Sequence, residues 1–345
     1  MQGDFFLTNW FLEGMKWVYY NLTSMNVTLT IVICTLILRA FSIFGDISSR
    51  KSSRKMALIQ PQIQKLQKKY ANDPQKLRAE QSKLMKQEGV SMWGGCLPML
   101  ITMPLFFCFF AAFRYWASEH MIELLLTANT DMEAAKEMFT NFKFLWVCNI
   151  WEADSALIPV LSKAETFLAT KNMANLLYFV EHPEAIKVFE ELGMAIQTSS
   201  VVNGEVVNTW QFIASDNAIA TYNNLTAPLM EMYPGYTNGW FIWPIITGGL
   251  MMLSSLLSQP RPKKGEQLTE QEKQTQKTSK IMMYIFPAFC LIACLSSSTA
   301  FAVYWSFSSL LMVVINLVLN KAFPRTVAPV EPTPEENFAA KIGRK

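Results

Sequence analysis

Long apolar stretches alternate with polar segments along this chain, and five of the stretches approach the length of a membrane-spanning helix. An apolar helix of about 20 residues is long enough to cross the hydrocarbon core of a bilayer. The fourth stretch is the shortest, which favours a locally thinned bilayer around it. The pattern predicts an all-α membrane protein whose transmembrane helices occupy residues 22–45, 94–117, 239–258, 280–296 and 299–319.

Residues 1–21 predict an amphipathic helix that lies in the membrane interface before the first span. The segment has neither the basic start nor the small-residue cleavage site of a secretory signal peptide. Its aromatic side chains suit the level of the lipid headgroups. These are Trp10, Phe11, Trp17 and Tyr20. The alternative is a poorly recognised anchor that is not cleaved.

Residues 46–93 predict a helical hairpin between the first two spans. Apolar residues recur there at steps of three and four, which is typical of one helix face. Asp73 suits a helix cap, Pro74 a first helical position and Gly89 the end of the second helix. The alternative is a solvated charged segment that only fixes topology. The apolar positions are Met56, Ile59, Ile63, Leu66, Tyr70, Leu77, Leu84 and Met85.

Residues 118–238 contain patterns of a folded, mostly helical segment outside the membrane. Thr130 and Glu133 have the spacing of a capping box, and Gly193 suits a helix end. Asn203-Gly204 favours a two-residue hairpin turn. Two polar segments follow later in the chain. We expect a loop at 259–279 and a disordered tail at 320–345.

The charges indicate how the chain crosses the membrane. The segments 46–93, 259–279 and 320–345 hold most of the 30 Lys and Arg residues, whereas acids predominate in the other two segments. Cytoplasmic loops of membrane proteins carry the excess of Lys and Arg. Five spans then place the amino terminus outside and the carboxyl terminus in the cytoplasm.

Arg39 lies inside the first predicted span, where a charge costs at least ~2.5–3.5 kcal/mol on insertion scales. None of the five predicted spans contains an aspartate or glutamate. The side chain therefore meets either a water-filled cavity or the cytoplasmic interface, which is within snorkelling reach. Small polar residues in the spans line such a cavity or join helices. A Trp such as Trp305 lines the cavity or sits in an aromatic belt.

Nothing in the chain indicates a catalytic site. The six cysteines and two histidines have no metal-ligand spacing, and no phosphate-binding glycine motif occurs. We therefore expect no enzyme activity, no metal and no cofactor. A small-solute transporter or channel is the rival function. Such proteins usually carry internal repeats, broken helices or intramembrane acids, which this sequence does not show.

Several motifs in order make the chain recognisable. Arg39 is followed by the hairpin sequence at 51–90 and by GGCLPMLITMPLFFCFF at 94–110. FLWVCNIW at 144–151, WPIITGGLMMLSSLLS at 243–258, KIMMYIFPAF and AFAVYW come later. Together they resemble the YidC/Oxa/Alb family of membrane protein insertases, and in particular its bacterial, Gram-positive-like members without a large periplasmic domain.

The resemblance implies a fold and a function. Five transmembrane helices would surround a hydrophilic groove that is open to the cytoplasm and carries the positive charge of Arg39. Acidic tails of incoming proteins would pass through this groove while the cytoplasmic hairpin recruits them. The implied groove residues are Arg39, Thr35, Ser42, Ser254, Ser258, Tyr304, Trp305 and Ser309. The implied hairpin residues are Arg54, Lys55, Lys65, Lys68 and Lys69.

The resemblance also implies partners and a location. The chain would act on nascent membrane proteins in the lipid bilayer of a bacterial plasma membrane, alone or with the Sec translocon. The signal recognition particle receptor and the ribosome are further implied partners, and DNA is not. The mildly basic tail is a weak ribosome-binding segment. A chaperone that assembles membrane proteins without inserting them needs the same groove and stays an alternative.

The chain departs from the family pattern in two places. Many members have a glutamine where this chain has Ser254, so the polar lining differs there. Residues 153–236 look like an insertion where relatives have a short link. The resemblance says nothing of what this mostly helical extracellular insert does.

Overall fold

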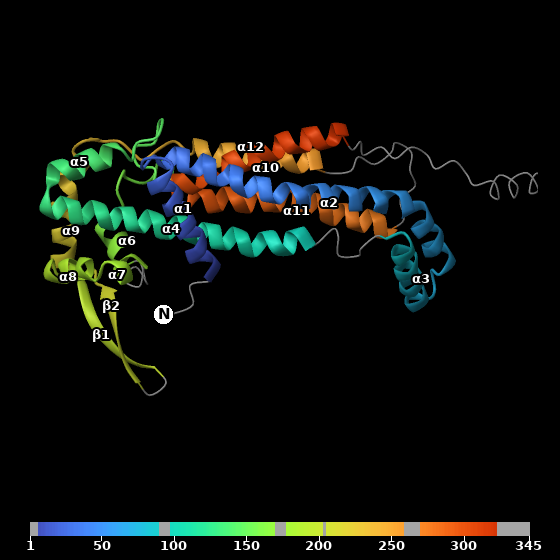
Figure 1. Ribbon diagram of the computed structural model, residues 1–345, viewed down its shortest axis with the longest axis horizontal. Helices are drawn as coiled ribbons and strands as arrows, with labels where there is room; N and C mark the ends of the chain where they lie inside the picture. The colour runs from blue at the N-terminus through green and yellow to red at the C-terminus, as the bar shows by residue number, and fades with distance from the viewer. Residues whose placement is uncertain (1–5, 90–96, 170–176, 203–204, 259–269, 323–345) are drawn as a thin grey trace, which may run out of the picture. The chain divides into compact units, whose positions relative to one another are not determined.

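The protein is mostly helical. The computed structural model describes residues 6–89, 97–169, 177–202, 205–258 and 270–322 (Figure 1). The helices are α1 (Phe6–Asn21), α2 (Val27–Lys69), α3 (Pro74–Gln87), α4 (Leu97–Thr130), α5 (Met132–Thr140), α6 (Ala164–Leu168), α7 (Leu177–Glu181), α8 (Pro183–Glu191), α9 (Asp216–Met230), α10 (Ile242–Ser258), α11 (Glu270–Leu295) and α12 (Thr299–Ala322). The strands are β1 (Ala195–Val202) and β2 (Glu205–Phe212).

The chain divides into two compact units, and the long helices contribute to both. The first unit comprises Met1–Leu36, Leu105–Met252 and Tyr284–Leu310. The second comprises Ile37–Pro104, Leu253–Met283 and Leu311–Lys345. Each unit therefore has its own packing and is described by itself.

Three long helices extend beyond the apolar stretches that predicted them. Helix α2 runs without a break over 43 residues, through residue 45, where we predict the end of the first span. The boundary between the span and the hairpin stays a prediction. The predicted loop 259–279 is helical from Glu270, and α4 continues to Thr130. Hydropathy marks the part of a helix that suits lipid, whereas Lys, Gln, Glu and Arg are good helix formers that prolong it.

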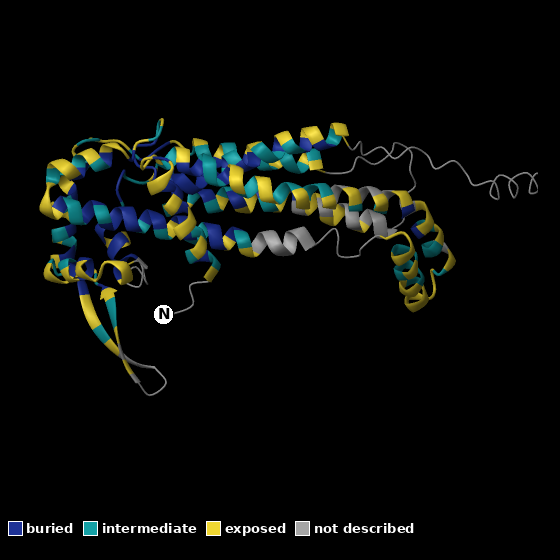
Figure 2. Cartoon of the chain, viewed as in Figure 1, coloured by how far each residue is buried: buried dark blue, intermediate teal, exposed yellow. Residues whose placement is uncertain are grey.

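Two helical stretches among the described residues are long and apolar enough to cross a membrane. These are Val27–Ser48 and Thr299–Ala322. Ile242–Ser258 and Met283–Leu295 are shorter apolar helices. Figure 2 shows exposed residues along α10 and α12, and many of these are large and apolar. The number of spans stays a prediction.

Aromatic rings of α4 and α12 form the centre of the first unit. Phe109 stacks on Tyr304 with ring centroids 5.3 Å apart, and Phe106 meets Trp305 edge to face at 4.8 Å. Phe113 packs against Phe301 at 5.9 Å. Such pairs contribute about 0.5–1.5 kcal/mol each beyond the burial of their area.

The predicted insert is built of short helices and one β-hairpin. Strands β1 and β2 pair antiparallel, with Ala195 opposite Phe212 and Val202 opposite Glu205. The predicted Asn203-Gly204 turn falls outside the described residues. Helix α8 ends before Gly193, whose φ of 70° suits glycine at this position, as its sequence predicts.

The capping box predicted at Thr130 is wrong by one residue. Asp131 caps α5, and its carboxylate accepts hydrogen bonds from the backbone N–H groups of Glu133 and Ala134. Thr130 is the last residue of α4, and its hydroxyl donates to the carbonyl of Thr127. Asp131 caps the helix in place of Thr130 because a charged acceptor binds helix N–H groups more strongly than a hydroxyl does.

The hairpin predicted between the first two spans is present as the end of α2 and α3. Ile59 and Ile63 are buried, and Met56, Leu84 and Met85 pack against them. The side chain of Asp73 accepts from the N–H of Lys76, so the predicted cap is confirmed. Few apolar residues hold the two helices together, which makes this hairpin a weakly packed element.

Candidate functional site

Arg39 faces the last long helix within the second unit. Its guanidinium is half-buried, and Nη1 donates to the sulfur of Met312 on α12 at 3.9 Å. The carbonyl of Arg39 accepts from the hydroxyl of Ser42 at 3.1 Å. The charge of Arg39 therefore lies against α12.

Helix α12 continues this contact with polar residues at every fourth position. Asn316 follows Met312 by one turn, and its Nδ2 donates to the hydroxyl of Ser254 on α10 at 3.1 Å. Asn320 follows by another turn and donates to the carbonyl of Leu257 at 3.1 Å. Residues four apart lie on one helix face. The spacing 312, 316 and 320 is the signal that would have found this face in the sequence.

Four of the predicted groove residues belong to the first unit. Thr35 is fully buried and its hydroxyl bonds back to the carbonyl of Ile31 at 2.6 Å. Tyr304 and Ser309 are buried, and Trp305 donates through Nε1 to the sulfur of Met251 at 2.8 Å. In the second unit, Ser258 is exposed. Their membership of one groove stays a prediction.

A hydroxyl pair joins α10 to α12 in the first unit. The hydroxyls of Thr247 and Ser306 lie 2.6 Å apart, and the hydroxyl of Thr247 also lies 3.3 Å from the carbonyl of Ala302. A Cβ on the neighbouring Gly248 would lie 3.1 Å from Leu291 on α11. Small residues let membrane helices approach this closely. Ser306 therefore joins helices.

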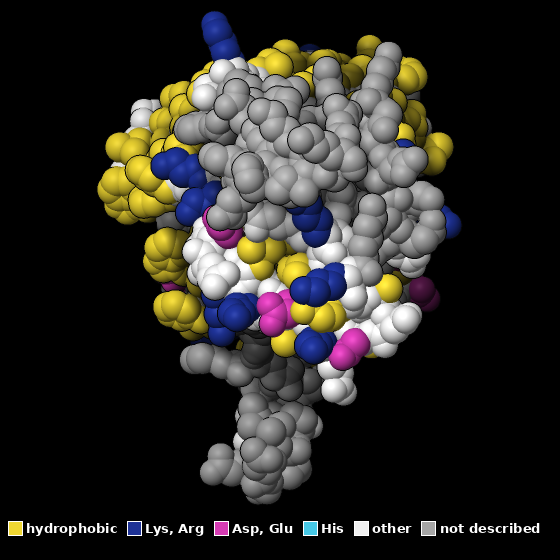
Figure 3. Space-filling model, turned by 90° about the vertical axis from the view of Figure 1, so that its right-hand side faces the viewer, with side chains coloured by type: hydrophobic (Ala, Val, Ile, Leu, Met, Phe, Trp, Pro, Cys, Tyr) yellow, Lys and Arg dark blue, Asp and Glu magenta, His cyan; other side chains and the backbone are white. Residues whose placement is uncertain are grey.

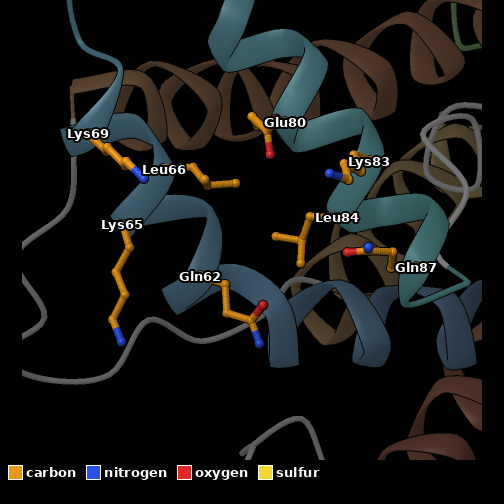
Figure 4. Close-up of a pocket in the computed structure, with 8 residues that line it drawn as sticks. All are labelled: Gln62, Lys65, Leu66, Lys69, Glu80, Lys83, Leu84 and Gln87. Atoms are coloured by element: carbon orange, nitrogen blue, oxygen red, sulfur yellow. The ribbon is translucent and has the colours of Figure 1, made fainter. Parts of the chain in front are cut away.

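The hairpin encloses a cleft between α2 and α3. The cleft has a volume of about 390 Å³. In Figure 4, Leu66 and Leu84 approach each other from opposite helices, with Lys69, Lys83 and Glu80 around them. Three of the lining residues are lysines and one is acidic, so the cleft is basic. The lining residues are Gln62, Lys65, Leu66, Lys69, Glu80, Lys83, Leu84 and Gln87.

Two of the five predicted recruitment residues line this cleft. Lys65 and Lys69 line the cleft, and Lys55 is exposed. Arg54 and Lys68 lie in α2, but their side chains fall outside the described ones. Lys69 also lies 5.3 Å from the ring centroid of Tyr70. Figure 3 shows Lys and Arg side chains among apolar ones on the face that it presents.

A buried aspartate fixes the start of α10. Asp154 is fully buried, and Oδ1 accepts from the backbone N–H groups of Trp240 at 2.7 Å and Phe241 at 3.1 Å. Its Oδ2 accepts from the N–H of Trp243 at 2.7 Å. A Cβ at Gly239 would clash with Oδ1 and with the backbone of Asp154, so only glycine fits there. A carboxylate at a helix start binds free N–H groups and favours the helix dipole.

The segment 144–162, here called the anchor segment, also holds the start of α12. The N–H groups of Thr299 and Ala300 donate to the carbonyls of Glu152 and Ile150 at 2.8 Å each. Asn238 joins the chain before α10 to the same segment, because its Nδ2 donates to the carbonyl of Asn149 at 2.8 Å. The anchor segment therefore positions two long helices at once.

Two acids with raised pKa values, buried Glu119 and half-buried Glu152, lie in the first unit. Burial raises the pKa of Glu119 to about 7, although Lys16 lies 2.7 Å away and opposes the shift. Burial also raises the pKa of Glu152 to about 7, against its hydrogen bonds from Ser162. His120, next to Glu119, stacks on Trp151 with ring centroids 4.2 Å apart.

Replacing Asp154 tests the anchor segment. Asp154→Ala leaves the N–H groups at the start of α10 without their acceptor, and losing charged buried hydrogen bonds costs about 3 kcal/mol. We expect thermal unfolding in detergent several degrees lower than that of the wild type. Asp216→Ala, an exposed position on α9, is the matched control. Equal midpoints for the two variants would contradict the role of Asp154.

Glu119 predicts a pH dependence of stability. Its pKa in the folded protein is about 7, above its ordinary 4.5. Between these values the folded state holds a proton that the unfolded state has released, so the free energy of unfolding falls as the pH rises. We expect Glu119→Gln to flatten the fall of the unfolding midpoint between pH 5 and about 8. Exposed Glu191→Gln should leave the slope unchanged, and an unchanged slope in Glu119→Gln would refute the assignment.

The described residues hold no metal-binding group, but they include several charged and polar features. Among the described residues, no group of three or more His, Cys, Asp or Glu side chains is arranged to hold a metal ion. The notable groups are a charge in an apolar helix, hydrogen-bonded polar residues between helices, and a basic cleft.

One known protein family matches most of this chain in sequence. The chain matches the family described as 60Kd inner membrane protein over residues 17–204 and 194–326. These two matches overlap at 194–204, inside the segment that we expect to be inserted.

Three relatives are each called membrane protein insertase YidC. The protein of Clostridium perfringens is 36% identical over 143 residues, which cover 41% of this chain and 52% of that protein. The protein of Chlorobaculum parvum is 38% identical over 111 residues, or 31% of this chain and 19% of that protein. The protein of Chlorobium luteolum is 30% identical over 160 residues, which cover 46% of this chain and 26% of that protein.

The chain thus spans about half the length of the first relative, or 52%, and less of the other two. The family match extends over most of the chain and includes Arg39, the hairpin and all five apolar stretches. The relatives are non-enzymatic insertases, in agreement with the absence of a catalytic motif. This chain belongs to the YidC/Oxa family of membrane protein insertases.

Proposed function

We propose that this protein inserts newly made membrane proteins into the bilayer by attracting their acidic tails to Arg39. Five membrane-spanning helices, at 22–45, 94–117, 239–258, 280–296 and 299–319, surround a hydrophilic groove that is open to the cytoplasm. The amino terminus lies outside and the carboxyl terminus in the cytoplasm. Family membership and the distribution of Lys and Arg support this topology.

The position of Arg39 is the observation that carries the proposal. Its guanidinium lies half-buried in an apolar stretch of α2 and contacts Met312 on α12. The five apolar stretches contain no aspartate or glutamate, and Arg39 adds positive charge to them, which attracts an acidic segment. A charge pair at an effective dielectric constant of 20 is worth about four times its value in bulk water.

Insertion then needs no covalent step. The positive charge offsets part of the cost of bringing an acidic tail into the membrane, and the groove shortens its path through hydrocarbon. Burial of the apolar span of the incoming protein in lipid supplies the driving force, at about 25 cal/mol per Å². The membrane potential acts on the acidic tail in the same direction.

The basic cleft between α2 and α3 is the entry point in this proposal. Its lysines attract acidic segments, and its apolar centre at Leu66 and Leu84 accepts an apolar side chain. The partners are nascent membrane proteins in the bacterial plasma membrane. The Sec translocon, the signal recognition particle receptor and the ribosome are further proposed partners.

Replacing Arg39 tests the attraction. Purified protein in liposomes should insert a single-span substrate with an acidic tail, and Arg39→Ala should lower the yield about tenfold, equivalent to about 1.4 kcal/mol. Arg39→Lys keeps the charge and should retain most of the yield. The measurement is protection of the translocated tail from added protease.

The controls separate charge from damage to the fold. Arg114→Ala removes an exposed arginine in the middle of α4, and this variant should insert substrate as well as the wild type does. A substrate with a neutral tail should respond little to Arg39→Ala. Full insertion of acidic tails by Arg39→Ala would refute the mechanism. Binding of substrate without insertion by the wild type would identify an assembly chaperone instead.

Replacing the cleft lysines tests recruitment separately. The triple variant Lys65→Gln, Lys69→Gln and Lys83→Gln should raise the substrate concentration needed for half-maximal insertion and make it less sensitive to salt. The maximal yield should stay near that of the wild type, because Arg39 is intact. A triple variant at Lys143, Lys163 and Lys187, all exposed, is the matched control. Identical curves would show that the cleft does not recruit.

A further inference from the structure

Four large apolar side chains protrude from the loops around the start of α10. Leu145 is 61% exposed, Leu157 85%, Tyr236 65% and Trp240 66%. Soluble proteins rarely gather exposed apolar residues in this way, and such patches mark interaction sites. We call these four residues the outer tips.

A well-packed frame holds the first of the outer tips. Leu145 lies in a turn closed by two backbone hydrogen bonds of 2.9 Å between Phe144 and Val147. The rings of Phe144 and Trp146 stack on Trp243 of α10, with centroids 5.7 and 5.3 Å apart. The turn is thereby fixed to the first turn of α10.

Hydrogen bonds of the anchor segment also fix the loops that carry Leu157, Tyr236 and Trp240. The N–H of Asn238 donates to the carbonyl of Ile158 at 3.1 Å, which places the loop of Leu157 beside the loop of Tyr236. The N–H of Trp240 donates to buried Asp154. In Figure 1, the chain between α5 and α6 accordingly lies at the start of α10.

Two strained residues help to direct the outer tips outward. Leu145 has a φ of 54° and Phe241, next to Trp240, a φ of 62°. Residues other than glycine rarely adopt positive φ, and strain of this kind persists where the surrounding structure imposes it. Here the hydrogen bonds of the anchor segment impose it at residues that display apolar side chains.

Two observations identify lipid as the occupant. First, the outer tips continue directly into the exposed apolar residues of α10, among them Ile245, which is 63% exposed. Second, Tyr and Trp are the side chains enriched where a membrane meets water. Leucines beside them suit the boundary between headgroups and acyl chains.

Helix α1 is linked to the anchor segment through Trp116 of α4. Tyr19 of α1 packs on Trp116 of α4 at 5.4 Å, and Trp116 packs on Trp151 of the anchor segment at 5.0 Å. The exposed side of α1 carries Trp10 and Trp17, 59% and 58% exposed. Aromatic and apolar side chains thus face outward from two elements that meet at Trp116.

We propose that the outer tips enter the outer leaflet of the membrane and bind phospholipid at the boundary between headgroups and acyl chains. This inference rests on the proposed function, because it requires that α10 crosses the membrane. The outer tips then anchor the start of α10 at a set depth. They also hold the predicted insert, residues 153–236, close to the membrane surface.

Photocrosslinking in liposomes of phosphatidylethanolamine and phosphatidylglycerol tests the inference. Benzoylphenylalanine is placed in the full chain at position 157, at 245 on α10 and at Glu191 on α8, one at a time. Residues 157 and 191 are both exposed and differ in predicted lipid contact. Mass spectrometry of the irradiated protein then measures the fraction that carries a phospholipid adduct.

We expect the adduct at position 157 to be comparable to that at 245 and several-fold above that at 191. An adduct at 245 together with a background value at 157 would overturn the inference alone. Background values at both positions would overturn the inference together with the proposed span at 239–258. A protein adduct at 157 in membranes that contain other proteins, without a lipid adduct, would also overturn it.

Discussion

The buried carboxylate of Asp154 is the interaction on which the arrangement of the first unit depends. It binds three backbone N–H groups at the start of α10, while carbonyls of the same segment bind those at the start of α12. Free N–H groups at a buried helix end must find acceptors within the protein. One irregular segment meets this need for both helices. It thereby sets where α10 and α12 begin, and the contacts of Thr247 with Ser306 and of Trp305 with Met251 follow from that register.

Polar groups in the long helices fall into two kinds. Several of the described ones are satisfied inside the chain: the hydroxyl of Thr35 bonds to its own helix, Thr247 pairs with Ser306, and Asn316 reaches Ser254. Such groups join helices and carry no net charge. Arg39 differs because its guanidinium remains positively charged whatever hydrogen bonds it makes. In the proposed groove, groups of the first kind alone would admit water, and Arg39 would add a preference for acidic segments.

The sequence predicted elements of this fold where local chemistry decides them. Asp73 and Pro74 begin α3 as expected, and Ile59 and Ile63 are buried. Helix ends beyond the apolar stretches were missed, because lipid selects apolar residues whereas Gly45 and the polar residues after it continue α2 at small cost. Asp154 and Asn238 were missed because their partners lie more than 80 residues away in sequence, at 86 for Asp154 with Trp240 and 89 for Asn238 with Asn149. Long-range polar contacts leave no periodic signal.

The contact between Asn316 and Ser254 bears on the position where the family resemblance leads us to expect a glutamine. A glutamine there would present its amide from α10, whereas serine is too short to reach far from the helix. In this chain, α12 supplies the amide instead, and Asn316 reaches the serine hydroxyl at 3.1 Å. A polar amide thus still lies between these two helices, but here it comes from α12 and not from α10. Because an amide and a hydroxyl are both neutral, this exchange leaves the net charge of the proposed groove with Arg39, so selection for acidic tails does not require the glutamine.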